Sequence, residues 1–242
     1  MGENQFNRLE IILKDKLEVL QDNCVAIIGC GGVGSYAIEA LARSGIKKLV
    51  IVDKDVIDIT NLNRQLMALH SNIGQSKVDV LKSRILDINP NANVVALKML
   101  YDEESAHKVY KEKPDFVIDA CDTISAKLHI IKYCYEKRIP FVSSMGAANK
   151  WNASNVEVVD ISKTYNDPIA KVIRTTLKKK GITKKVPVVF SDEIPFKPEI
   201  DNKEYSNTRK ELPLLGSTAF VPSTFGLVAA NYCCDILLKK EK

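Results

Sequence analysis

The feature that most constrains the fold is a glycine-rich turn, GCGGVG at residues 29–34. The short apolar run CVAIIG (24–29) leads into it and is typical of a buried parallel strand. A helical pattern from Val33 to Arg43 follows, and a second apolar run, KKLVIVD (47–53), comes next. Strand, glycine turn, helix and strand in this order predict a βαβ unit.

Helical and strand patterns go on alternating along the chain. Predicted helices cover Ser76–Ile88, Glu103–Lys111, Ser125–Glu136 and Pro168–Lys179. Predicted strands cover Asn93–Lys98, Asp115–Asp119, Pro140–Ser144, Val156–Val159 and Pro187–Ser191. Repeated alternation of this kind favours an α/β fold. We therefore expect a Rossmann-like, doubly wound, mostly parallel sheet with flanking helices.

The chain has 242 residues, enough for one sizeable core, so we expect a single domain over 1–242. Helical spacing of apolar residues between Phe6 and Leu20 predicts an N-terminal helical element within 1–22. Residues 192–216 are rich in prolines and charges and show no helical or strand periodicity, so they predict a long, mobile surface loop. A predicted helix at 219–240 closes the chain.

Composition favours an ordinary globular protein, with 45% hydrophobic and 27% charged residues. We expect no membrane span, and the N-terminus lacks the pattern of a signal peptide, so we expect a cytoplasmic location. None of the six cysteines form a CxxC pair. We therefore expect reduced, mostly structural thiols and no zinc site.

The glycine turn has the spacing of a phosphate-binding loop. Gly29 permits the tight turn, Gly31 lets the backbone approach a phosphate, and Gly34 lets the helix pack on the strand, with Gly32 between them. The helix N-terminus then faces the phosphates. Asp53, at the end of the second strand, can accept hydrogen bonds from ribose hydroxyls. These residues alone do not distinguish NAD from ATP.

Three later blocks favour ATP: DKDVIDITNLNRQ (53–65), GQSK (74–77) and VIDACDTISAK (117–127). Arg64 and Lys77 are cations able to clamp a triphosphate and offset charge on the phosphorus being transferred. Asp122 is a candidate Mg²⁺ ligand, and Asp119 ends its strand at the carboxyl edge of the sheet. Hydride transfer needs no such set. The sequence therefore predicts that a carboxylate is adenylated.

These blocks resemble the ThiF/MoeB superfamily of ubiquitin-activating-like adenylating enzymes over about Phe6 to Met145. The resemblance adds further members to the expected ATP site: Asp55, Asn61, Asn63 and Gln65. It also implies a homodimer in which Arg8 reaches the ATP of the partner subunit. The family usually has arginine where this chain has Gln5, and an ordinary arginine at a helix N-terminus is the alternative for Arg8.

Two later stretches, 143–174 and 221–239, resemble the branch of this family that dehydrates threonylcarbamoyladenosine in tRNA. That resemblance implies adenylation of the threonyl carboxylate, followed by attack of the neighbouring carbamoyl group to close a ring. An intramolecular nucleophile has a high effective molarity, so the enzyme need not supply a thiol. Mg²⁺ is expected beside ATP. The family resemblance also allows a bound monovalent cation and sulfur-transfer proteins as partners.

Positive charge is concentrated between Ile161 and Val186, which hold eight basic residues and one acidic residue. A local charge of this size can neutralise RNA phosphates. The candidate tRNA contacts are Lys171, Arg174, Lys178, Lys179 and Lys180. A solvated, lysine-rich helix face is the alternative explanation of the same residues.

Three other functions remain open from sequence. The chain could adenylate a ubiquitin-like sulfur carrier, although such activators usually have the CxxC pairs that this chain lacks. It could be a non-catalytic nucleotide-sensing or RNA-binding module, although Arg64, Lys77 and Asp122 are all present. It could be an NAD dehydrogenase, although no convincing base for hydride transfer accompanies the glycines.

Overall fold

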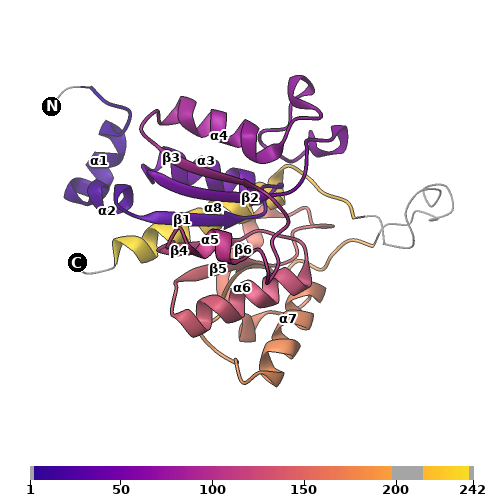
Figure 1. Ribbon diagram of the computed structural model, residues 1–242. Helices are drawn as coiled ribbons and strands as arrows, with labels where there is room; N and C mark the ends of the chain where they lie inside the picture. The colour runs from indigo at the N-terminus through magenta and orange to yellow at the C-terminus, as the bar shows by residue number, and fades with distance from the viewer. Residues whose placement is uncertain (1–2, 198–214, 240–242) are drawn as a thin grey trace.

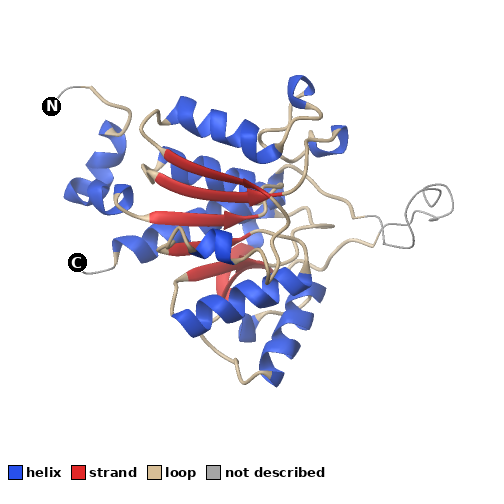
Figure 2. Cartoon of the chain, viewed as in Figure 1, coloured by secondary structure: helices blue, strands red, loops and turns tan. Residues whose placement is uncertain are grey.

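The computed structural model describes residues 3–197 and 215–239, and its centre is a seven-stranded sheet (Figures 1 and 2). The order across the sheet is β3-β2-β1-β4-β5-β7-β6, and only β6 is antiparallel to its neighbour. The strands are β1 (Cys24–Ile28), β2 (Lys48–Asp53), β3 (Asn93–Lys98), β4 (Phe116–Asp119), β5 (Phe141–Ser144), β6 (Val156–Asp160) and β7 (Pro187–Ser191). The expected doubly wound, mostly parallel sheet is confirmed.

Helices cover both faces of the sheet. One face packs on α3 (Gly34–Arg43), α4 (Lys77–Ile88) and α8 (Phe220–Leu238), and the other on α5 (His107–Tyr110), α6 (Ile124–Lys137) and α7 (Pro168–Lys179). Strand β1 is buried along its whole length and serves both cores, because alternate side chains point to opposite faces. Val25 and Ile27 join the first core, and Ala26 and Ile28 join the second.

The sheet positions a ligand site between β1 and β4. Strand β1 pairs with β2 on one side and with β4 on the other, so the strand order reverses at this point. In open α/β sheets, ligands bind in the crevice at the carboxyl ends of the strands beside such a reversal. Gly29 and Ala120 directly follow the two central strands and therefore meet at this edge.

Two predicted helices are shorter than expected. The N-terminal helical element is broken into α1 (Asn7–Leu13), a 3-10 turn (Lys14–Lys16) and α2 (Leu17–Gln21), and Lys14 lies at a left-handed φ of 56°. None of the α1 residues are buried, and Leu13 at its end is only partly buried against the core, so little packing holds a continuous helix there. Of the helix predicted at 103–111, only α5 is helical in the structure, because turns occupy residues 103–106.

The predicted loop at 192–216 lies largely outside the described residues, as does the last residue of the predicted helix at 219–240. Both described ends of the loop meet Asn149: its carbonyl accepts from Phe196 N at 2.6 Å, and its N–H donates to Gly216 O at 2.8 Å. Among the described residues, α8 is the one helix long and apolar enough to cross a membrane, by length and composition only, which is weak evidence for a span. It contributes Val221, Phe225 and other residues to the core, and the core helix of a soluble protein passes the same test.

Candidate active site

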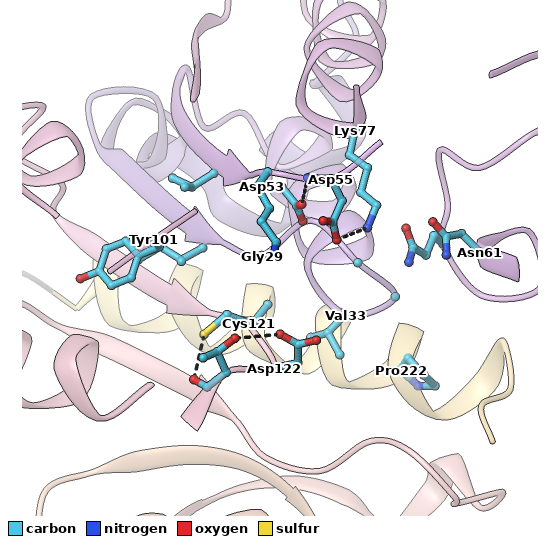
Figure 3. A pocket seen from close by; sticks show the side chains of 18 of the residues that line it. Gly29, Val33, Asp53, Asp55, Asn61, Lys77, Tyr101, Cys121, Asp122 and Pro222 are labelled. Atoms are coloured by element: carbon cyan, nitrogen blue, oxygen red, sulfur yellow. Dashed lines mark hydrogen bonds and ion pairs between the residues drawn. The ribbon is translucent and has the colours of Figure 1, made fainter. Parts of the chain in front are cut away.

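A cavity of about 1100 Å³ opens at the carboxyl ends of the central strands. It collects residues from segments far apart in the sequence, and Figure 3 shows their side chains converging on one space. The predicted site residues that line it are Gly29, Gly31, Gly32, Asp53, Asp55, Asn61, Arg64, Gln65, Lys77 and Asp122. The structure therefore brings together most of the residues that the sequence pattern singled out.

The glycine turn is required by close packing as well as by its backbone conformation. Gly29 has φ +93°, and a Cβ there would lie 2.6 Å from Ala120 O. A Cβ on Gly34 would lie 1.8 Å from Gly29 O, so this glycine lets α3 pack against the turn. Gly31 differs, because a Cβ there would meet only Gln65 Nε2 at 3.8 Å. Backbone at Gly31 is thus open to a ligand, as phosphate binding requires.

The first turn of α3 completes this cradle. N–H groups at a helix N-terminus have no carbonyl partners within the helix and favour anions. Gly31, Gly32 and Val33, which immediately precede α3, all line the cavity. A nucleotide phosphate therefore fits at this point by both geometry and charge.

Asp53 ends β2 and is fixed by the backbone around it. Its carboxylate accepts from Cys30 N at 2.7 Å and from Asp55 N at 2.8 Å. These two bonds link the glycine turn to the segment after β2 and orient the carboxylate at the cavity wall. A carboxylate has further lone pairs, so Asp53 retains capacity to accept bonds from ribose hydroxyls.

Lys77 begins α4 and is nearly buried, with 7% of its side chain exposed. Its Nζ lies 3.3 Å from Asp55 Oδ2, and the two side chains approach each other in Figure 3. A cation at a helix N-terminus is unfavourable towards the helix dipole, and burial adds a desolvation cost. A polyanionic ligand in the cavity would offset both effects.

Arg64 and Gln65 stand at the other wall. Arg64 Nη1 donates to Thr60 O at 2.7 Å and to Asn63 Oδ1 at 3.0 Å, which holds the guanidinium beside the cavity. Gln65 Oε1 is buried without a hydrogen-bond partner. Buried polar atoms are normally satisfied, so this orphaned acceptor indicates a donor that arrives with ligand or water.

Asp122 supplies a carboxylate at the floor of the cavity (Figure 3). It is exposed, and Thr123 Oγ1 donates to it at 3.3 Å. Within residues 3–197 and 215–239, no group of three or more His, Cys, Asp or Glu is placed to hold a metal by itself. Mg²⁺ typically takes one or two carboxylates together with substrate phosphates, and a lone Asp122 fits that mode of binding.

Three predicted ATP-site residues do not line the cavity. Gly34 packs against the glycine turn, and Asn63 Nδ2 donates to Ser217 O at 2.9 Å. Asp119 is fully buried behind the cavity, where its side chain pairs with Lys127. It ends β4 as predicted, but its carboxylate is turned away from the ligand space by this ion pair.

The remaining predicted residues lie elsewhere on the chain. Arg8 is exposed on α1, which lies beside the amino ends of the central strands, away from the cavity (Figure 1). The basic residues of α7 are exposed except Arg174, whose guanidinium donates to Thr164 O at 2.9 Å and to Thr164 Oγ1. Arg174 therefore already has an internal structural role.

Sequence reasoning missed parts of the cavity wall. Met99, Leu100 and Tyr101 follow β3 and line it, and the Tyr101 hydroxyl forms a hydrogen bond with His129 Nδ1 at 2.9 Å. No motif marks these residues, and only their place after a strand could have suggested them. Lys127, which pairs with Asp119 and does not itself line the cavity, was also missed, although it stands at the end of the 117–127 block.

Cys121 is the one cysteine among the cavity-lining residues, and it does not have the properties of a nucleophile. Burial, followed by the charge of Asp119, raises the pKa of its thiol well above the usual value. Its Sγ donates to Asp119 Oδ1 at 3.0 Å. Because the thiolate is the reactive form, this thiol is held in its unreactive state.

Fold and cavity together define a nucleotide-binding α/β protein with cations and a carboxylate at the phosphate end. The ThiF family model matches residues 3–242, and the chain belongs to the ThiF family.

Similarity to known proteins extends along nearly the whole chain. This chain is 50% identical to the tRNA threonylcarbamoyladenosine dehydratase of Bacillus subtilis, and the alignment covers 98% of this chain and 95% of that protein. The Escherichia coli protein of the same name is 33% identical, with 93% and 89% covered. The crystal structure of E. coli tRNA N6-threonylcarbamoyladenosine dehydratase with AMP superposes with a TM-score of 0.88 at 32% identity, over 97% of this chain and 94% of that chain.

Proposed function

We propose that this chain is an ATP-dependent dehydratase of threonylcarbamoyladenosine in tRNA. The observation that carries the proposal is the convergence of Lys77, Arg64 and Asp122 on the cavity beside an open glycine turn. The structurally similar E. coli enzyme has been solved with ATP as well as with AMP. The same cavity in this chain is therefore assigned to ATP.

Each wall of the cavity has a part in adenylation. The glycine turn and the first turn of α3 hold phosphates, and Asp53 holds the ribose. Arg64 and Lys77 offset the charge that builds up as the substrate carboxylate attacks the α-phosphorus and pyrophosphate leaves. Asp122 would hold Mg²⁺, which neutralises phosphate charge when bound. The acyl adenylate that forms has AMP as its leaving group.

Ring closure needs no reactive group from the protein, which only has to hold the substrate in position. The carbamoyl group of the same nucleoside attacks the activated acyl carbon, loses a proton and expels AMP, so one water is lost overall. Holding the two groups within one molecule supplies a high effective molarity. The unreactive environment of Cys121 agrees with this route, because an acyl-thioester intermediate would require an ionised thiol.

We propose further that two chains form a homodimer and that Arg8 acts across the interface. Arg8 is exposed, and α1 has no buried residues, so a partner subunit can cover this helix. Ile11 and Ile12 on the same helix are 79% and 78% exposed, which leaves an apolar surface for such contact.

The basic residues of α7 are proposed to bind the phosphates of tRNA, and the protein is proposed to act in the cytoplasm.

Pyrophosphate release separates this function from activation of a sulfur carrier. The protein is incubated with ATP and Mg²⁺, together with either tRNA bearing threonylcarbamoyladenosine or a carrier protein ending in Gly-Gly. Stimulation by the modified tRNA alone is expected. Stimulation by the carrier and not by tRNA would replace the proposal with the carrier-activating function.

A further inference from the structure

A buried ion pair lies directly behind the loop that carries Asp122. Lys127 Nζ is 3.2 Å from both carboxylate oxygens of Asp119, and the two side chains are 1% and 0% exposed. Neither side chain lines the cavity. The pair is therefore not part of the ligand-binding surface itself.

The pair joins four segments of the chain. Lys127 stands in the first turn of α6 and also donates to Ser144 O at 2.6 Å, at the end of β5. Asp119 ends β4 and accepts from Ser143 Oγ at 2.5 Å and from Cys121 N at 3.2 Å. The loop 120–123 thus has both of its ends fixed by one ion pair.

The other side of this loop is held by the glycine turn. Ala120 N donates to Ile28 O at 2.8 Å, and the missing Cβ of Gly29 lets the backbone at Ala120 and Cys121 approach closely. The loop 120–123 therefore lies in contact with the glycine turn on one side and with the ion pair on the other. Any movement of the loop would displace Asp122 relative to the phosphate cradle.

Stability alone does not account for a lysine at this position. Burying two charges carries a desolvation cost, and well-packed apolar residues of similar volume are often as stabilising or more so. The benefit of the pair is its geometry, because a lysine with three donors and a carboxylate with several acceptors fix the relative positions of their segments. Groups that support the ligands of a metal site influence metal affinity in this way.

We propose that Lys127 is a positioning residue for the adenylation site: through Asp119 it fixes the loop 120–123, so that the Asp122 carboxylate stands in place to hold the metal of the nucleotide. This inference rests on the proposed function in one respect, the role of Asp122 as a metal ligand. It assigns to Asp119 a supporting function in place of the nucleotide contact expected from sequence.

The test is the binding of Mn²⁺, used in place of Mg²⁺, measured by paramagnetic resonance in the presence of a non-hydrolysable ATP analogue. Lys127→Met is expected to weaken Mn²⁺ binding by about 10- to 100-fold, as loss of a group supporting a metal ligand typically does. Binding of AMP without metal, measured by calorimetry, is expected to stay within about twofold, because the glycine turn and Asp53 are unchanged.

Lys150→Met is the matched control. Lys150 and Asp167 form a second buried pair, with an Nζ–Oδ2 distance of 3.5 Å and exposures of 1% and 0%. It therefore carries a similar cost of leaving one buried charge unpaired, but it does not touch the loop 120–123. Loss of thermal stability without loss of Mn²⁺ affinity is expected, which separates positioning from general destabilisation.

A double variant, Lys127→Met with Asp119→Asn, guards against a single variant that fails to fold. Removing both charges leaves no unpaired ion in the core, so its stability is expected to approach the wild-type value. Its Mn²⁺ affinity is expected to remain low, because the side chain at position 127 then bonds neither to Ser144 O nor to position 119. Wild-type Mn²⁺ affinity in either folded variant would overturn the inference.

Asp122→Ala separates this inference from the proposed function. If Asp122→Ala abolishes Mn²⁺ binding and Lys127→Met leaves it unchanged, only the positioning role of Lys127 is wrong. If Asp122→Ala has no effect on Mn²⁺ binding, the metal role of Asp122 fails, and both the proposed site and the inference built on it are overturned.

Discussion

The nucleotide cavity and the basic surface of α7 differ in how their residues are held. In the cavity, Lys77, Arg64 and Asp53 come from different segments, and each is fixed by hydrogen bonds or an ion pair. At the end of α7, Lys178, Lys179 and the capping residue Lys180 are consecutive, exposed residues. The first arrangement determines positions for a small ligand, whereas the second supplies charge without a fixed geometry.

This difference indicates that the two regions have different functions, catalysis in the cavity and attraction of RNA at α7. Groups that stabilise a transition state must be held in place before the reaction, because reorganisation would cost part of their effect. Groups that attract RNA phosphates act over a longer distance and tolerate movement, since most of their contribution is electrostatic. Substitutions in the two regions should therefore change different measured quantities, namely turnover in the cavity and salt-dependent affinity on α7.

The largest effect is expected from the cavity cations. Lys77→Ala and Arg64→Ala should each lower the rate of AMP formation by about 100- to 1,000-fold, since each removes a donor aimed at developing charge. Single-turnover kinetics with modified tRNA measures this rate. Lys82→Ala, an exposed lysine on the same helix as Lys77, is the control and should retain the wild-type rate. Wild-type turnover in either cavity variant would remove the distinction between the two regions.

A second large effect should come from Arg8, which tests whether the cavity is complete within one chain. Arg8→Ala should abolish AMP formation, and so should Asp122→Ala. After subunit exchange between the two inactive variants, mixed dimers contain one site with an intact Arg8 and an intact Asp122. Recovery of AMP formation is expected. Demonstrated exchange without recovery would mean that Arg8 does not act in trans.

A moderate effect is expected on α7. Charge reversal at Lys178, Lys179 and Lys180 should weaken tRNA binding and make it less dependent on salt, with the slope falling by roughly 0.7 to 0.9 for each phosphate that is no longer neutralised. ATP affinity should not change. Charge reversal at Lys108, Lys111 and Lys113, which are also exposed, gives the same change in net charge and is the control. Equal salt slopes in the two triple variants would show that α7 is only a solvated helix face.

The smallest effect is expected at Cys121. Because burial and Asp119 raise the pKa of this thiol, it remains protonated between pH 6 and pH 9, and the thiolate would form only above that range. Reaction of native protein with iodoacetamide at Cys121, followed by mass spectrometry of its peptide, should therefore be slow throughout that interval and should still be rising with pH at its upper end, because only the thiolate reacts. Rapid alkylation that levels off near neutral pH, as expected of a thiol already ionised there, would revive the cysteine as a nucleophile.

The parts predicted from sequence are those that local chemistry specifies. The glycine spacing follows from close contacts and a backbone conformation that few residues allow, and the apolar strands follow from their burial, with Asp53 at the end of β2. The orientation of Asp119 could not be predicted, because it depends on Lys127, whose position is set by packing of α6 against the sheet. The break in the N-terminal helix depends likewise on packing, because no residue of α1 is buried whereas α2 buries Leu17 and Leu20.

The most direct test of the account is the mass of the modified nucleoside. Purified protein, ATP, Mg²⁺ and tRNA bearing threonylcarbamoyladenosine are incubated, the RNA is digested under mild conditions, and the nucleosides are analysed by mass spectrometry. The expected product is lighter by one water, is formed with one AMP per nucleoside, and is absent with Lys77→Ala. A nucleoside of unchanged mass, in a preparation that binds both ATP and this tRNA, would contradict it.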